Sequence, residues 1–361
     1  MKTTERYVSP PDISLLREKF AGIDLMVNGR QLIYFDNSAT TLRLKEVVQT
    51  LCDFYYKMNS NIHRAVHTLA DMATEAYENA RKEGASFLGA TPDEVFFVRS
   101  TTEAINVIAN GMAHKVLKCG DGVLLTEMEH HSNIVPWQMV REKYGINIYV
   151  APVTEDGELD YIELQRIIEE HSNIKVISVT HVSNVLGTIN DIKRICHIAR
   201  EKGIYVVVDG AQAVAHIPIN VKELGCDAYV FSGHKVFGPF GVGVAFISSS
   251  IINDIYPYLG GGSMIESVSF EKTTFLTPPL RFEGGTPPVA DAVALAPALK
   301  FMRTRDAEFF VNQEHELARY LYEKLRELDF IRIIGTSSNR IPVFSFVVKG
   351  AHSYDVGVLL N

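Results

Sequence analysis

Lys235, in the segment Ser232-Gly-His-Lys235, is a side chain of this sequence with clear capacity for covalent chemistry. The segment follows an apolar run and precedes the glycine-containing stretch 238–243. A lysine that is costly to bury in its charged form can condense with an aldehyde to an imine, from which an amino acid can be exchanged. A single lysine before a glycine loop is usually a plain surface residue. Whether Lys235 is instead a reactive residue therefore depends on the motifs around it.

A second candidate is Asp209, at the end of the apolar run Ile204-Tyr-Val-Val-Val-Asp209 and shortly before Gln212. A carboxylate at the end of a buried strand needs a cation or a hydrogen-bond donor to offset its desolvation. A protonated pyridine nitrogen would be such a partner, and the pairing would sustain the ring as an electron sink. A helix-capping aspartate and a magnesium ligand are the alternatives that this segment leaves open.

Hydroxyl groups also stand where a predicted helix begins, in Ser100-Thr-Thr-Glu103. The amino terminus of a helix offers unpaired backbone N–H groups and a positive dipole, so Thr101 and Thr102 are candidates for holding a phosphate. Ser232 and His234, beside Lys235, are further donors for the same group. A plain helix cap followed by a first-turn glutamate explains Ser100 to Glu103 without any ligand.

Two adjacent histidines follow the apolar run 122–126, in Glu127-Met-Glu-His-His-Ser-Asn133. An imidazole placed over a pyridine face can stack on it and take part in proton transfer, and His130 is our candidate for this role. Metal binding is the lesser alternative, because no carboxylate or cysteine spacing around the histidines completes a zinc motif. We therefore expect no metal site.

Each of these candidates follows an apolar run that predicts a strand. Several runs are apolar at successive positions, which is typical of strands buried on both faces of a mainly parallel sheet. Helical stretches such as 191–202 fill the intervals. We predict an α/β fold with a doubly wound sheet, whose ligands gather beyond the carboxyl ends of the strands. The predicted strands are 94–98, 122–126, 147–150, 175–179, 204–208, 228–231 and 243–247.

The pattern along the chain predicts three parts. Residues 1–30 form an amino-terminal arm with a short helix near 13–20, and they contribute to the small domain. Residues 31–289 form the large domain, and residues 290–361 form a smaller, incomplete α+β domain that ends in an apolar helix. The predicted helices and strands of this last part are 290–302, 312–328, 331–334 and 343–348.

The composition is that of an ordinary globular protein, with 47% apolar and 22% charged residues in a chain of 361. The formal net charge of -8 argues against a general nucleic-acid or membrane-surface binder. No apolar run reaches the roughly 20 residues that cross a bilayer, and the first residues lack the core of a signal peptide, so we expect a cytoplasmic protein. The four cysteines are dispersed, which suggests neither a zinc site nor a disulfide framework, and we expect each to be a small buried apolar residue rather than a catalytic thiol.

Taken together, these motifs resemble those of the class V aminotransferase superfamily, and within it the cysteine desulfurases of the SufS/CsdA (NifS-like) type. The resemblance covers nearly the whole chain in the family's order. It implies a fold-type-I transferase that depends on pyridoxal 5'-phosphate. The segments that carry it are Tyr34–Thr41, Asn61–Thr68, Ser100–Asn106, Met128–Trp137, His181–Thr188, the stretches around Asp209 and Lys235, and Arg281–Pro287.

The resemblance implies a role for each residue of a cofactor site. Lys235 would carry the cofactor as a Schiff base and move the α-proton of the substrate, Asp209 would pair with the pyridine nitrogen, and Gln212 would contact the ring hydroxyl. His130 would stack on the ring. The phosphate would be bound by Thr102, Ser232 and His234, with the backbone of Thr101 contributing.

Other implied positions lie toward the substrate and toward a second subunit. Asn184 would lie near the ring and the substrate carboxylate, and His63 and Arg64 would line the substrate side. Thr286 would reach the phosphate of the neighbouring subunit, which implies a homodimer with shared sites.

The implied reaction converts L-cysteine to L-alanine and passes the sulfur, as an enzyme persulfide, to an acceptor protein of iron–sulfur cluster assembly. Selenocysteine lyase activity on L-selenocysteine, another class V activity such as an aminotransferase or epimerase, and a non-enzymatic cofactor-binding scaffold are the alternatives. In the family, the nucleophilic cysteine and a carboxylate-binding arginine lie beyond the point that matches Leu360-Asn361, and no cysteine here sits in a matching motif. We therefore expect a chain that binds the cofactor but lacks the carboxyl-terminal segment of a desulfurase and releases little sulfide or alanine.

Overall fold

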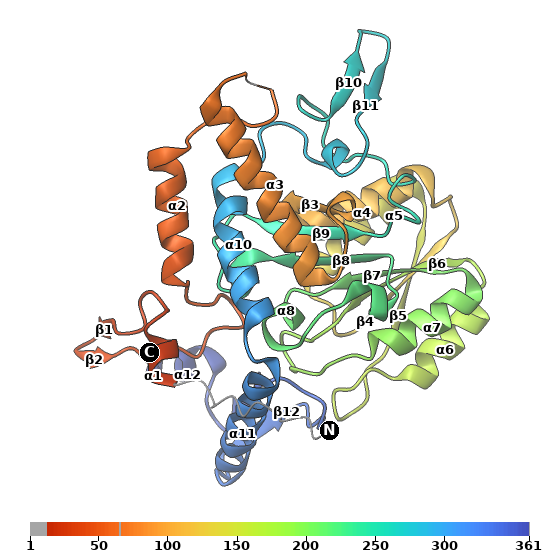
Figure 1. The fold of residues 1–361 in the computed structure, drawn as a ribbon. Coiled ribbons are helices and arrows are strands. Elements are labelled where there is room, and N and C mark those ends of the chain that lie inside the picture. Colours follow the sequence, from red (N-terminus) through yellow and green to blue (C-terminus); the bar gives the residue numbers. More distant parts are fainter. Residues whose placement is uncertain (1–12, 65, 361) are drawn as a thin grey trace, which may run out of the picture.

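A computed structural model describes residues 13–64 and 66–360, and a sheet of seven strands forms the centre of the molecule (Figure 1). All the strands except β9 run in one direction, because β9 pairs antiparallel with both of its neighbours and the other pairs are parallel. The prediction of a mainly parallel sheet is confirmed. In spatial order the strands are β3 (Val95–Val98), β9 (Gly243–Ile247), β8 (Ala228–Ser232), β7 (Tyr205–Asp209), β6 (Ile174–Thr180), β4 (Gly122–Thr126) and β5 (Asn147–Ala151).

Continuous apolar runs became strands that are buried on both faces. Every residue of β3, β4, β8 and β9 is buried, and each of these strands lies within a residue of its predicted bounds. The strand β5 pairs only with β4 at the edge of the sheet and is partly exposed. The reversed direction of β9 was not predicted, because its run of apolar residues indicates burial and carries no signal of direction.

Helices cover both faces of the sheet, as a doubly wound fold requires (Figure 1). On β3, Val95 and Phe97 face one layer, while Phe96 and Val98 face the other, as expected for alternating side chains. No helix in the described part of the chain is long and apolar enough to cross a membrane. The first layer contains α2 (Lys45–Lys57), α3 (Thr68–Leu88), α6 (Tyr161–Glu170), α7 (Ile192–Lys202) and α10 (Val289–Thr304), and the second contains α4 (Thr101–Lys115) and α5 (Val135–Tyr144).

In the described part of the chain, three small antiparallel sheets lie outside this core. The strands β1 (Met26–Val27) and β2 (Arg30–Gln31) follow the short helix α1 (Ile13–Arg17). The hairpin of β10 (Ile265–Val268) and β11 (Thr273–Phe275) projects from the body at the top of Figure 1. It was not predicted, because β10 is largely exposed and alternating polar residues interrupt its apolar pattern.

The carboxyl-terminal part of the chain forms a separate helix and sheet at the bottom of Figure 1. The helix α11 (Ala307–Arg326) precedes β12 (Ile331–Ile334) and β13 (Ser345–Val348), which pair antiparallel, and α12 (Ser353–Leu360) follows. These elements confirm the helices and strands predicted there to within a few residues. The boundaries of the three predicted parts stay a prediction.

A buried ion pair joins α3 to the segment that leads into α10. The Arg81 guanidinium donates to both carboxylate oxygens of Glu283, at 2.7 and 2.9 Å, and to the Val95 carbonyl at 3.1 Å. Glu283 also accepts a hydrogen bond from the Phe97 backbone at 2.8 Å. Both side chains are almost fully buried. The pair therefore ties the edge strand β3 to α3 and to the segment that precedes α10.

We predict that Glu283→Gln destabilises the protein by about 3–5 kcal/mol, because Arg81 would remain buried with only the partly exposed carboxylate of Glu78 to balance its charge. Urea denaturation at neutral pH measures the change. Glu327→Gln, which breaks the exposed pair of Lys324 and Glu327, serves as the control and should leave the unfolding midpoint almost unchanged. Equal midpoints for the two variants would contradict the importance of the buried pair.

Candidate active site

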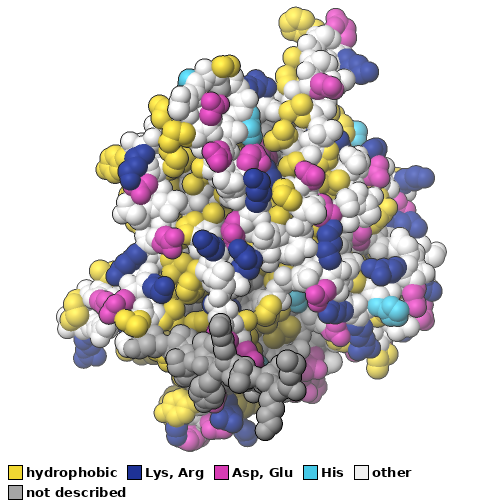
Figure 2. Space-filling model, viewed as in Figure 1, with side chains coloured by type: hydrophobic (Ala, Val, Ile, Leu, Met, Phe, Trp, Pro, Cys, Tyr) yellow, Lys and Arg dark blue, Asp and Glu magenta, His cyan; other side chains and the backbone are white. Residues whose placement is uncertain are grey.

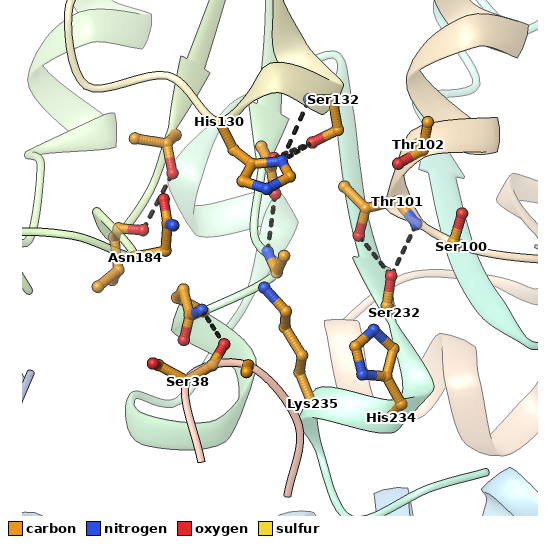
Figure 3. Close-up of a pocket in the computed structure, with 16 residues that line it drawn as sticks. Ser38, Ser100, Thr101, Thr102, His130, Ser132, Asn184, Ser232, His234 and Lys235 are labelled. Carbon is orange, nitrogen blue, oxygen red and sulfur yellow. Dashed lines mark hydrogen bonds between the residues drawn. The ribbon is translucent and has the colours of Figure 1, made fainter. Parts of the chain in front are cut away.

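A cavity of about 430 Å³ opens where the parallel strands end (Figure 3). The carboxyl ends of neighbouring parallel strands meet at one edge of the sheet, so residues far apart in the sequence converge there. Residues following β3, β4, β6, β7 and β8 form its walls. The predicted site residues that line it are Thr101, Thr102, His130, Asn184, Asp209, Gln212, Ser232, His234 and Lys235.

Lys235 ends the short turn η3 (Gly233–Lys235) that follows β8, and its amine reaches into the middle of the cavity (Figure 3). Burial lowers the pKa of this amine, and the negative charge of Asp209 opposes that effect. A lowered pKa increases the fraction of neutral amine, which is the form that attacks a carbonyl carbon. The position and the electrostatics of Lys235 therefore suit imine chemistry.

Asp209 closes β7 with a carboxylate that is only 3% exposed. Its Oδ1 accepts a hydrogen bond from the Ala211 backbone at 2.9 Å, while among the described residues Oδ2 has only a long contact of 3.5 Å from the Ser132 hydroxyl. Burial raises the pKa of Asp209, against the lowering effects of the Ala211 N–H and of Lys235. A buried carboxylate with one underused oxygen fits a cationic N–H donor, such as a protonated pyridine nitrogen.

The amino terminus of α4 forms a polar corner of the cavity together with the end of β8. Ser100 caps the helix by accepting a hydrogen bond from the Glu103 backbone. The Ser232 hydroxyl oxygen accepts a hydrogen bond from the Thr101 backbone at 2.8 Å and lies 2.9 Å from the Thr101 hydroxyl. The Thr102 side chain lines the same corner. Hydroxyl groups at the positive end of a helix dipole are a chemical fit for a phosphate.

His234 lies beside this corner, where its Nδ1 is 3.3 Å from the Thr40 hydroxyl. Burial lowers the pKa of His234 to about 4, and the positive charges of Lys235 and Arg43 add to the effect. The neutral ring can still donate one hydrogen bond to an anion. The segment around Thr40 and Thr41 packs on this turn, since the Thr41 backbone donates to the His234 carbonyl at 3.1 Å.

The opposite side of the cavity carries amide groups. Figure 3 shows Asn184 across the cavity from Thr101 and Ser232, with Lys235 between them. The Gln212 side-chain amide donates to the Ser38 carbonyl at 2.7 Å, which leaves the amide oxygen of Gln212 for another partner. The cavity therefore has an anion-binding end and an amide end on either side of the reactive amine.

His130 follows β4 and covers the cavity from above in Figure 3, with its ring over the amine of Lys235. It begins the short turn η2 (His131–Asn133), and its Nδ1 accepts a hydrogen bond from the Ser132 backbone at 3.1 Å. Burial lowers the pKa of His130, and the charge of Lys235 contributes to the shift. A planar ring in this position can stack on a flat ligand held below it.

Sequence reasoning missed Glu129, which anchors the loop that carries His130. One carboxylate oxygen of Glu129 accepts from the Thr126 hydroxyl at 2.6 Å and from the Thr180 backbone at 3.0 Å. The other accepts from the Asn133 amide at 2.6 Å. Burial raises the pKa of Glu129 to about 7 despite these three donors. An acid directly before a histidine pair at the end of a strand was the only sequence signal for this role.

The structure does not bring every predicted residue to the cavity. The His63 ring contacts Glu78 at 2.9 Å, and neither His63 nor Arg64 lines the cavity within this chain. Thr286 also lies outside it, shortly after the buried Glu283. Three serines that line the cavity received no role from the sequence, namely Ser38, Ser100 and Ser132.

The cysteines lie away from the cavity. Cys196 and Cys226 are buried as expected, and burial raises the pKa of the Cys196 thiol to about 12. The expectation of burial is wrong for Cys52 and Cys119, which are exposed. Cys52 lies on a helix with only two buried side chains, Val47 and Phe54, and its position falls on the other side of that helix. None of the four lines the cavity.

We predict that Glu129 makes stability depend on pH between its ordinary pKa of 4.5 and its folded pKa of about 7. Since the folded pKa is raised, the protonated acid contributes stability that is fully present below pH 4.5 and is lost as the pH rises through 7. The free energy of unfolding of the wild type, relative to Glu129→Gln, should therefore fall across this range in urea titrations.

Glu78→Gln is the matched control for that experiment. Although burial opposes the shift, hydrogen bonds from His63 and Arg81 lower the pKa of Glu78 to about 2. The contribution of Glu78 to the free energy of unfolding is therefore constant above pH 4.5 and is lost only as the pH falls toward 2. Parallel stability curves for the wild type and Glu129→Gln would show that Glu129 titrates normally.

Comparison with known proteins agrees with this geometry. Residues 33–361 match the family described as Aminotransferase class-V. A protein of Xylella fastidiosa named "Probable cysteine desulfurase" is 42% identical over 97% of this chain, which covers 84% of that relative. A protein of the same name from Mycolicibacterium paratuberculosis is also 42% identical over 97% of this chain, but the chain spans only 51% of its length.

Among solved structures, the apo cysteine desulfurase of Thermococcus onnurineus NA1 is similar, with a TM-score of 0.90 and 36% identity. The similarity covers 98% of this chain and 86% of that one. The family match extends over most of the sequence and includes every residue that lines the cavity. The chain therefore belongs to the class-V aminotransferase family and, within it, to the cysteine desulfurases.

Proposed function

We propose that the cavity binds pyridoxal 5'-phosphate and that the protein converts L-cysteine to L-alanine, with transfer of the sulfur to a thiol acceptor. One observation carries the proposal. The amine of Lys235 and the buried carboxylate of Asp209 share one cavity, whose far corner is formed by hydroxyl groups at the start of α4. A pyridine aldehyde that carries a phosphate matches all three features.

Different residues of this chain would bind different parts of the cofactor. Lys235 would bind its aldehyde carbon, and Asp209 would keep its ring nitrogen protonated through the underused Oδ2. Thr102, Ser232 and His234 would hold the phosphate, with Thr101 and the helix dipole beside it. His130 would cover the ring face, and Gln212 would contact the ring hydroxyl through its free amide oxygen.

When bound, the cofactor supplies an electron sink for the charge left on the α-carbon of an amino acid. Lys235, once released by the amine of the substrate, is placed to take the α-proton with its neutral amine. Asn184 lies at the amide end of the cavity, where it would orient the substrate carboxylate. The burial that lowers the pKa of Lys235 thus serves both imine formation and proton transfer.

The sulfur would leave as part of a new S–S bond. A thiolate attacks the substrate sulfur, and the C–S bond breaks with its electron pair left on carbon, which takes up a proton to give alanine. Since none of the four cysteines lines the cavity, we assign the attack to a thiol other than these four. We propose that the sulfur then passes to an acceptor protein of iron–sulfur cluster assembly in the cytoplasm.

We also propose a homodimer in which Thr286 completes the phosphate site of the partner. The Gly285 backbone donates to the Gly262 carbonyl at 2.8 Å, so the segment of Thr286 is joined to the base of the β10–β11 hairpin. Phe270 at the tip of that hairpin is fully exposed. Figure 2 shows hydrophobic side chains on the hairpin and over the region of α2, where Tyr55 and Tyr56 are exposed. Such surfaces are typical of contacts between subunits.

We predict that borohydride reduction of the protein loaded with pyridoxal 5'-phosphate attaches the cofactor covalently to Lys235. Peptide mass spectrometry locates the adduct. Lys235→Ala should lose both the adduct and the imine absorbance, whereas Lys202→Ala, at an exposed position, should keep both. An adduct on another lysine of the wild type would contradict the assignment.

We predict that the loaded protein forms alanine from L-cysteine when a small thiol is added as the sulfur acceptor, and little alanine without it. Lys235→Ala should lower the rate by roughly 10²–10⁴-fold, because it lacks the group that moves the proton. A variant without the four cysteines should keep the rate of the wild type. Formation of a keto acid in place of alanine would contradict the proposal and favour an aminotransferase.

A further inference from the structure

We propose that Ser132 is a positioning residue that fixes the tautomer of His130, so that the neutral imidazole turns an Nε2–H toward the cavity. The inference rests on the proposed function for its consequence in catalysis, although the hydrogen bonds behind it belong to the protein alone. Ser132 lines the cavity, and its proposed role is to orient His130 rather than to bind Lys235.

The first step of the argument is the direction of one hydrogen bond. The Ser132 backbone nitrogen lies 3.1 Å from Nδ1 of His130, and a backbone N–H can only donate. Nδ1 must therefore accept, which leaves it without a proton. In a neutral imidazole, the proton then resides on Nε2, because one ring nitrogen carries the hydrogen when the other does not.

The second step is the Ser132 hydroxyl, which lies 2.8 Å from the same Nδ1 and 3.5 Å from Oδ2 of Asp209. Since Nδ1 has no proton to give, the hydroxyl is the donor in the short contact. Ser132 thus directs two donors, its backbone N–H and its hydroxyl, at the one lone pair of Nδ1. Its single hydroxyl proton is then not available to Oδ2 of Asp209, which lies at the longer distance. Ser132 is almost fully buried, so water does not compete strongly for these bonds.

The third step is the rigidity of the loop. Glu129 and Asn133 flank the segment of His130 and Ser132, and their side chains are joined by the 2.6 Å bond described above. The Asn133 oxygen also accepts from the Ser178 hydroxyl at 2.6 Å and from the indole of Trp137 at 3.3 Å. This buried network holds both ends of the turn, so the Ser132 N–H stays aimed at His130.

The consequence concerns the division of roles in the cavity. A neutral His130 with a proton on Nε2 can donate a hydrogen bond or a proton to a bound ligand, but that nitrogen has no free lone pair to accept the α-proton. Lys235 is then the base, and His130 is the donor. The titratable groups that face His130 are Lys235, Asp209 and His131. Burial and Lys235 favour the neutral ring, and Asp209 opposes them.

The test is nuclear magnetic resonance of the protein labelled with ¹⁵N-histidine, recorded at neutral pH with and without pyridoxal 5'-phosphate. His130→Gln identifies the resonances of His130 by difference. We expect Nδ1 at the shift of an unprotonated nitrogen and Nε2 at the shift of a protonated one. A protonated Nδ1 in the wild type without cofactor would overturn the proposal.

Variants separate positioning from simple stability. Ser132→Ala removes the hydroxyl and should move the Nδ1 shift part of the way toward the protonated value, while Ser132→Thr should restore it. Thr188→Val removes a buried hydroxyl that donates to the Gly157 carbonyl and does not belong to this network, and it should leave the shifts unchanged. An unchanged tautomer in Ser132→Ala would overturn the role of the side chain.

Failure of the proposed function would look different from failure of this inference. A wild type that does not bind pyridoxal 5'-phosphate, as judged by absorbance after dialysis, would remove the proposed cofactor site. The tautomer of His130 in the cofactor-free protein would still be measurable and would still support or overturn the role of Ser132.

Discussion

The carboxylate of Asp209 lies buried at the end of β7, and the free-energy cost of keeping a charge there shapes much of the site. The Ala211 backbone offsets part of that cost, and the amine of Lys235 adds a favourable charge. The Oδ2 atom still lacks a short hydrogen bond from the described residues, since the Ser132 hydroxyl lies 3.5 Å away. The protein therefore holds a carboxylate whose best partner is a cation supplied by a ligand, which is the basis for assigning the cavity to a protonated pyridine ring.

The same constraint explains why the surrounding loops are so firmly attached. A ligand that bridges Asp209 and the amino terminus of α4 requires both ends of the cavity to keep their separation. Glu129 holds the His130 loop to β6, and Ser232 holds the end of β8 to the start of α4. The Arg81–Glu283 pair performs a similar task at the edge strand, where it joins β3 to α3 and to the segment before α10. Each is a buried polar group whose partners leave little freedom to move.

The parallel sheet and the polar residues at its strand ends could be predicted from the sequence, because strands buried on both faces produce a strong hydrophobic pattern. Runs such as Tyr205–Asp209 consist of apolar residues at successive positions, and the polar residue that ends each run stands out against them. Convergence of these polar residues then follows from parallel strands alone. The pattern could not reveal the reversed β9 or the exposed hairpin of β10 and β11. Hydrophobic periodicity depends on burial, so it indicates neither the direction of a strand nor the presence of an exposed hairpin.

The sequence by itself determined the α/β class, the order of the polar motifs along the chain and the position of Lys235 and Asp209 at or after the ends of apolar runs that predict strands. These properties depend on which residue types are buried, and burial is encoded locally by composition and period. Only the tertiary structure decided that Glu129 accepts three donors, that Ser132 faces Nδ1 of His130, and that Cys52 and Cys119 are exposed. The direction of a hydrogen bond and the exposure of a single side chain depend on atoms from several elements at once, and no single stretch of sequence contains them.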